Sequence, residues 1–235
     1  MGTYVGVSGF SYTTWKGAFY PQDTKSEDFL RCYSAKLRSV EINSSFYAPP
    51  RSSVLKSWAG KTGDGFRFSF KAPRKITHIS KLGDGSSQAA KDFSDSISVM
   101  DSKRGPILFQ LPPYMKYDLE RLERFLSETP DIRERVFEFR NASWFQGSTY
   151  ELLGEGGAAH CISETDERKP ELQVIGDLTY FRLRRNHYKP SEIDSWAKVI
   201  RENASSSRAC YVYLRHDETG ENALLAQGLA EKLGV

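Results

Sequence analysis

Short apolar runs alternate with amphipathic stretches along the whole chain. Eight of these runs are rich in β-branched or aromatic residues and are bounded by Gly, Pro or Asn, which is typical of strands. They cover residues 4–8, 39–43, 67–71, 107–111, 136–140, 158–163, 179–183 and 211–214. The pattern therefore predicts eight short strands spread evenly over the chain.

Between the strands, apolar residues recur at spacings of three and four, as on one face of a helix. Residues that favour helix starts precede most of these stretches, namely Ser26, Ser53, Ser86, Asp118 and Ser191. A last helix carries Leu225, Leu229 and Leu233, and a weaker pattern covers residues 148–154. Residues 164–177 show no convincing helix, so we expect an irregular sixth connection from strand to strand.

Strands that alternate with helices pair in parallel, because parallel neighbours need a crossover connection. We therefore predict an α/β fold, a compact parallel (β/α)8 barrel formed by one domain over residues 1–235. An open, doubly wound sheet is the alternative.

Polar residues share one face of these strands. Side chains alternate across a strand, so Glu41 points opposite to Val40 and Ile42. If the apolar face packs on the helices, the polar face lies near the barrel axis, late in each strand, at the mouth where barrel enzymes keep their sites. This set comprises Glu41, Asn43, Lys71, Gln110, Glu138, Arg140, Arg182 and Arg215.

Two interpretations of this polar set remain open. The acids and bases could neutralise one another as a structural salt-bridge network, because an unpaired charge inside a barrel costs several kcal/mol. They could instead form a ligand site. For the complete set, which converges on one mouth, we favour the ligand site.

Composition limits the cellular setting. The 235 residues have a net charge of only +3, and no long apolar run is present. The first residues lack the features of a secretory signal. We therefore expect a cytoplasmic protein without a membrane segment. The three cysteines lie far apart in sequence, which argues against a disulfide framework.

Five motifs in order resemble the YecE-like family, a family whose members have no established activity. They are VGVSGFSYTTWKGAFYP at 5–21, EINSSFY at 41–47, FKAPRKITH at 70–78, LFQLPP at 108–113 and EFRNASWF at 138–145. The resemblance covers nearly the whole chain and implies a compact TIM barrel. The chain departs from the family late, where Arg184–Arg185 replace a frequent His-Gly pair and Arg215–His216 replace paired asparagines.

Basic segments after strands three and seven favour an anionic ligand, because arginine binds oxyanions through a planar fork. We expect a phosphate-containing or nucleic-acid-derived ligand at the mouth. Glu41 and Glu138 are the candidate acid/base pair of a hydrolase or lyase acting on a phosphate ester. The candidate ligand-binding residues are Ser8, Asn43, Lys71, His78, Gln110, Arg140, Arg182 and Arg215.

Other functions stay open at this stage. The basic rim suits a non-catalytic protein that binds nucleic acid or another partner, and the two glutamates suit a sugar-directed hydrolase or isomerase. No motif requires a cofactor. Motifs with the spacing of metal ligands are absent, which argues against a metal site. A single Mg²⁺ or Mn²⁺ held by carboxylates is the remaining metal option. The sequence leaves the substrate and the oligomeric state undetermined.

Overall fold

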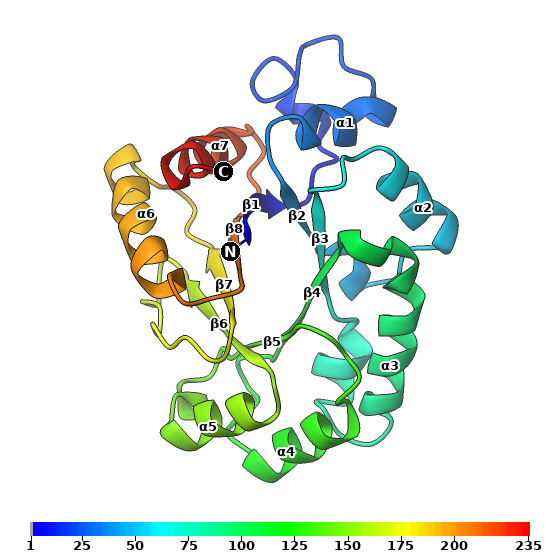
Figure 1. Ribbon diagram of the computed structural model, residues 1–235, viewed down its shortest axis with the longest axis vertical. Coiled ribbons are helices and arrows are strands. Elements are labelled where there is room, and N and C mark those ends of the chain that lie inside the picture. The colour runs from blue at the N-terminus through cyan, green and yellow to red at the C-terminus, as the bar shows by residue number, and fades with distance from the viewer. Residues whose placement is uncertain (1) are drawn as a thin grey trace.

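Eight parallel strands form a closed barrel in the computed structural model, which describes residues 2–235 (Figure 1). The strands follow chain order around the barrel, and β1 pairs with both β2 and β8. This confirms the predicted (β/α)8 barrel over the open sheet. The strands are β1 Gly2–Ser8, β2 Ser39–Ile42, β3 Arg67–Lys71, β4 Arg104–Gln110, β5 Arg135–Glu138, β6 Ala159–Glu164, β7 Leu178–Leu183 and β8 Ala209–Leu214.

Within residues 2–235, seven α-helices surround the strands, as the spacing of apolar residues predicted. They are α1 Phe29–Ser34, α2 Ser52–Gly60, α3 Ser86–Ile97, α4 Leu119–Glu128, α5 Gly147–Glu155, α6 Pro190–Ala204 and α7 Glu221–Leu233. Residues 165–177, all described, connect β6 to β7 without a helix. This confirms the irregular sixth connection, where Pro170, Gly176 and many charged residues leave no apolar helical face.

The helix starts agree only in part with the sequence. The Asp118 carboxylate accepts the backbone N–H of Arg121 at 3.1 Å and caps α4 as expected. The helix α6 begins at Pro190, with Lys189 as the N-cap, which is earlier than the expected start at Ser191. The Glu192 carboxylate accepts the backbone N–H of Lys189 at 2.7 Å, and the helix begins between them. Backbone geometry, which the sequence does not display, decides between such neighbouring caps.

The apolar face of the strands packs under the helices, as their alternating side chains predicted, and the barrel interior holds a second apolar layer that was not predicted. Val40, Phe68 and Phe137 face outward and join the large core under the helices. A second cluster fills the barrel interior and contains Leu108, Val136, Ala159, Cys161, Leu178, Tyr180, Ala209, Tyr211 and Tyr213. Large aromatic rings therefore pack the middle of the barrel, and polar side chains take the strand ends.

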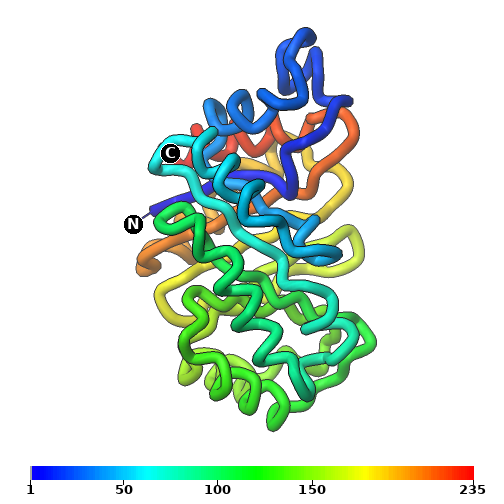
Figure 2. The backbone as a smooth tube through the Cα atoms, turned by 90° about the vertical axis from the view of Figure 1, so that its right-hand side faces the viewer, coloured from blue at the N-terminus to red at the C-terminus, as the bar shows by residue number. Residues whose placement is uncertain are grey.

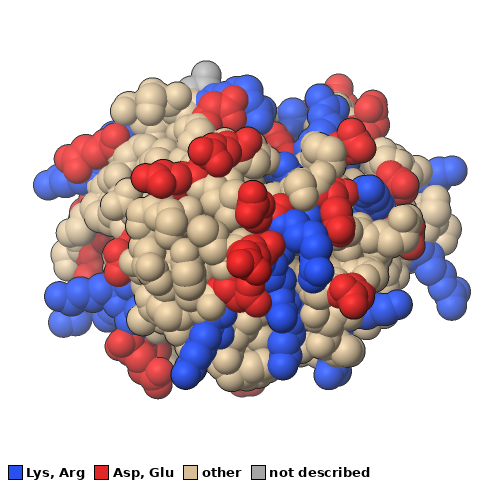
Figure 3. Space-filling model, turned by 90° about the horizontal axis from the view of Figure 1, so that it is seen from below, with Lys and Arg blue, Asp and Glu red and all other residues tan. Residues whose placement is uncertain are grey.

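The outside carries charges of both signs. Figure 2 shows the barrel from the side, with the N and C labels on the same side of the view. In Figure 3, the face below α4 and α5 has acidic and basic side chains interspersed, so it presents no surface of a single sign.

None of the helices within residues 2–235 combines the length and the apolar character that crossing a membrane requires.

Candidate functional site

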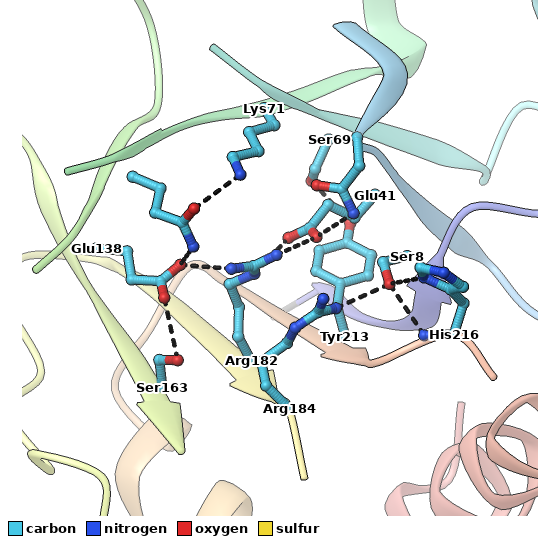
Figure 4. A network of polar contacts seen from close by, with 12 residues as sticks. Ser8, Glu41, Ser69, Lys71, Glu138, Ser163, Arg182, Arg184, Tyr213 and His216 are labelled. Atoms are coloured by element: carbon cyan, nitrogen blue, oxygen red, sulfur yellow. Dashed lines mark hydrogen bonds and ion pairs between the residues drawn. The ribbon is translucent and has the colours of Figure 1, made fainter. Parts of the chain in front are cut away.

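One arginine joins the two predicted acids inside the barrel mouth (Figure 4). Glu41, Glu138 and Arg182 each occupy the last or next-to-last position of their strand, and at most 3% of each residue is exposed. The Arg182 guanidinium bonds Glu41 twice, at 2.8 and 2.9 Å, and Glu138 at 2.5 Å. The triad therefore links β2, β5 and β7 across the barrel.

The triad keeps both acids ionised. Burial alone would raise the pKa of each carboxyl, but the Arg182 charge and its hydrogen bonds outweigh burial. The pKa of Glu138 falls to about 2, and the pKa of Glu41 lies below its ordinary value. Tyr180 donates a further hydrogen bond to Glu41 at 2.8 Å. Both groups are thus fixed anions at neutral pH and poor proton donors.

A lysine extends this network toward the opening. Lys71 donates to the Gln110 side-chain oxygen at 2.7 Å, and Gln110 donates to Glu138 at 2.9 Å. The Lys71 ammonium also lies 4.1 Å from the centroid of the Phe46 ring, a cation–π contact. Burial, and then the neighbouring Arg182 charge, lower the pKa of Lys71 to about 8. Its ammonium lies where an incoming anion would stabilise it.

A second polar cluster surrounds Ser8 at the end of β1. The Ser8 hydroxyl accepts hydrogen bonds from Arg184 at 2.8 Å and from the backbone N–H of His216 at 3.0 Å. The His216 ring stacks on Tyr12 with 5.0 Å between ring centroids. Burial and the nearby Arg182 charge lower the pKa of Arg184 to about 10, so it remains a cation at neutral pH. Ser8 therefore positions Arg184.

These networks form the floor of an open hollow of about 660 Å³. Five cationic and three acidic side chains line it, so it is net positive. Within residues 2–235, four of the cations have no carboxylate within 4.0 Å. They are Lys71, Arg140, Arg184 and Arg215. The full lining is Asn43, Phe46, Tyr47, Lys71, Gln110, Glu138, Arg140, Thr165, Asp166, Glu167, Arg182, Arg184, Asn186, Arg215 and His216.

Most predicted site residues line this hollow, but their depth differs from the expectation. Arg140 and Arg215 are exposed at the rim instead of lying near the axis, because β5 ends at Glu138 and β8 ends at Leu214. Ser8 and Glu41 lie behind the lining. His78 follows β3 and packs edge-on against Phe46, at 4.8 Å between centroids, outside the hollow.

Arg184 and His216 were not among the candidate site residues. The strand alternation that selected Arg182 applies equally to Arg184, two positions later on the same face. That signal was therefore present in the sequence. His216 follows β8 in a loop and carries no such periodic signal.

The carboxylates are not arranged as metal ligands. Among residues 2–235, no three His, Cys, Asp or Glu side chains form a group that could hold a metal ion. The carboxylate oxygens of Glu41 and Glu138 accept hydrogen bonds from Arg182 and its neighbours Tyr180 and Gln110.

A family model described as "Protein of unknown function DUF72" matches residues 4–235. The chain belongs to the DUF72 family. This confirms the YecE-like resemblance, because two relatives are the UPF0759 proteins YunF of Bacillus subtilis and YecE of Escherichia coli. YunF is 23% identical, over 99% of this chain and 95% of its own length. YecE is 28% identical, over 65% of this chain and 54% of its own length.

Solved structures agree with this assignment. A DUF72 family protein from Thermotoga maritima is 26% identical, with a TM-score of 0.90 and complete coverage of both chains. A DUF72 family protein from Enterococcus faecalis is 18% identical, with a TM-score of 0.81 over 99% of this chain and 96% of its own. A D-psicose 3-epimerase from Clostridium cellulolyticum, 8% identical with a TM-score of 0.60 over 100% and 98% of the two chains, shares the barrel fold alone.

Proposed function

We propose that the barrel mouth binds a small anionic ligand, with a phosphate group as the best candidate. The observation that carries this proposal is the set of four cations in the hollow, none of which has a carboxylate partner in the described chain. Lys71, Arg140, Arg184 and Arg215 would bind the anion from different sides. Charge-assisted hydrogen bonds of this kind are about twice as strong as neutral ones.

The deeper residues act as a rigid support for these cations. The Arg182 guanidinium is already hydrogen-bonded to two glutamates, so it would act on the ligand mainly through its electrostatic potential and less through direct contacts. Asn43 adds specificity, because its side-chain oxygen is buried without a hydrogen-bond partner. A hydroxyl or amine on the ligand would satisfy that oxygen once the Asn43 side chain turns toward the hollow, which it lines. The ligand class is therefore a phosphorylated small molecule that also carries a hydrogen-bond donor.

The acid/base roles of Glu41 and Glu138 remain a prediction. A general acid must hold a proton near the working pH, and the low pKa of both carboxyls opposes this. Their ion pairs favour another role, as counter-charges that hold Arg182, and through Gln110 also Lys71, in place. We therefore place binding ahead of a hydrolase or lyase reaction.

Titration calorimetry with inorganic phosphate and glucose 6-phosphate, with glucose as the neutral comparison, tests this function. We expect both phosphates to bind and glucose not to bind. Arg140→Gln and Arg184→Gln should each weaken binding about tenfold, because each removes a charged hydrogen-bond donor. Arg31→Gln, on the exposed side of α1 and without an ion pair, is the matched control and should bind as wild type.

Two results would overturn the proposal. Glucose binding as tightly as glucose 6-phosphate would favour the sugar-directed alternative. A single-stranded oligonucleotide that binds with steep salt dependence, while neither phosphate binds, would favour the nucleic-acid alternative.

A further inference from the structure

A second, larger hollow lies at the opposite end of the barrel, where the strands begin. Its volume is about 790 Å³, and it is lined by the first residues of β1, β3, β4 and β8 and by the loops that precede β4 and β5. We call it the lower hollow. Its lining comprises Gly2, Tyr4, Arg67, Ser98, Asp101, Ser102, Arg104, Gly105, Arg133, Glu134, Arg208, Ala209 and Tyr211.

Four arginines line the lower hollow, and three of them lack an acidic partner. Arg208 is paired with Glu134 and Asp177, both at 3.0 Å. In the described part of the chain, no carboxylate comes within 4.0 Å of the other three, Arg67, Arg104 and Arg133. Asp101 lines the hollow too, but it is exposed and makes no ion pair with them. The local charge is therefore positive.

Two of the three arginines are held in position by backbone oxygens. Arg67 donates to the carbonyls of Asp64 and Phe66 at 2.9 and 3.0 Å, and its guanidinium lies 5.3 Å from the Tyr4 ring centroid. Arg104 donates to the carbonyl of Arg133 at 3.3 Å. Ordering a guanidinium in advance lowers the entropy cost of binding.

The backbone around the lower hollow is also strained. Asp101 has φ 48° and ψ −125°, and Glu134 has φ 56°, values that residues other than glycine rarely adopt. Both residues line the hollow. Such strain persists only where surrounding contacts impose it, and it concentrates at functional sites.

We propose that the lower hollow is a second anion site, which binds a diphosphate group through Arg67, Arg104 and Arg133. The three guanidiniums come from the starts of β3 and β4 and from the loop before β5, which are neighbours around the barrel, so they lie side by side along one wall of the hollow. Each planar fork can take two oxygens of one phosphate. Three forks and a hollow of this size suit two linked phosphates better than a single one.

The two sites can be separated by mutation. In an Arg140→Gln/Arg184→Gln background, which weakens the mouth, inorganic pyrophosphate is titrated by calorimetry at low and at high salt. We expect binding to persist in this background and to weaken at high salt. Adding Arg104→Gln and Arg133→Gln should then reduce the affinity at least about tenfold. Adding Arg31→Gln instead should leave it unchanged.

The inference fails if the mouth-weakened protein does not bind pyrophosphate, or if Arg104→Gln and Arg133→Gln leave the affinity unchanged. Thermal unfolding without ligand verifies that each variant is folded. Arg133 is exposed, so Arg133→Gln alone should fold even if Arg104→Gln does not, and its expected effect is a loss of affinity in the same direction.

Discussion

Arg182 dominates the electrostatics of the barrel interior. Within residues 2–235 it is the cation that pairs with both Glu41 and Glu138, and all three residues are almost fully inaccessible to water. Breaking a buried ion pair on one side costs more than the pair itself contributes, because the remaining charge is left without a partner. The arginine is thus a strong structural requirement, whatever ligand the mouth binds.

Arg182→Met should destabilise the fold by about 3–5 kcal/mol at pH 7, because two buried carboxylates would then face each other. Their pKa values would rise above the ordinary 4.5, so the variant's folded state would bind more protons than its unfolded state. The loss should therefore shrink as the pH falls toward about 5. Denaturant unfolding at several pH values measures this. Arg140→Met, exposed at the rim, should lose little at any pH, and an equal loss in both variants would contradict the assignment.

Lys71 should make anion binding depend on pH. Its pKa of about 8 means that the ammonium loses its proton just above neutral pH, so affinity should be highest below pH 8 and fall as the pH rises through it. Sulfate suits this measurement because its own charge is constant over the range. Lys71→Arg should bind sulfate nearly equally at pH 7 and pH 8.5, because Arg184, whose pKa is about 10, stays charged over this range. An equal fall of sulfate affinity with rising pH in wild type and in Lys71→Arg would show that Lys71 does not cause the pH dependence.

At the scale of elements, a buried arginine at the start of β5 fastens two helices to the barrel. Arg135 donates to the Leu126 carbonyl at 2.9 Å and the Thr129 hydroxyl at 3.0 Å, beside the end of α4, and also to the Gly156 carbonyl that follows α5. Helix ends leave carbonyls without internal partners and attract positive charge. Arg135 supplies both hydrogen-bond donors for these carbonyls and a positive charge near the helix ends.

Arg135→Met should therefore lower the free energy of unfolding by about 1–3 kcal/mol, because buried carbonyls lose their donor. The midpoint of denaturant unfolding measures the change. Arg133→Met, two residues earlier and exposed, is the control and should change stability by less than about 0.5 kcal/mol. A wild-type midpoint for Arg135→Met would show that water replaces these hydrogen bonds.

Periodicity predicted the elements and their facing well, because both follow from regular backbone geometry. Alternation placed Glu41, Glu138 and Arg182 inside the barrel from sequence alone. It could not give their depth: Arg140 shares the facing of Glu138 but lies beyond the strand end. Nor could it select partners, since long side chains from strands far apart in sequence meet only in the closed barrel. The Arg182 bridge was one of several pairings that the sequence allowed.

At the scale of the whole molecule, two positively charged hollows lie at opposite ends of one barrel, although the chain carries a net charge of only +3. Within residues 2–235, six arginines without a carboxylate inside 4.0 Å lie at these two ends: Arg67, Arg104 and Arg133 at one, and Arg140, Arg184 and Arg215 at the other. A barrel fold accounts for one of these ends, since the carboxyl ends of the strands converge there. The lower hollow depends on side chains that no fold rule predicts.

The packed interior between these ends determines whether a ligand can pass through the barrel. Tyr180 and Tyr213 are fully buried in the lumen, and the Arg182 bridge spans it nearer the mouth. The cylinder is consequently a dead end from both directions rather than a conduit. A molecule that enters at one opening has to depart through the same opening, and nothing released at the top can be handed through to the base.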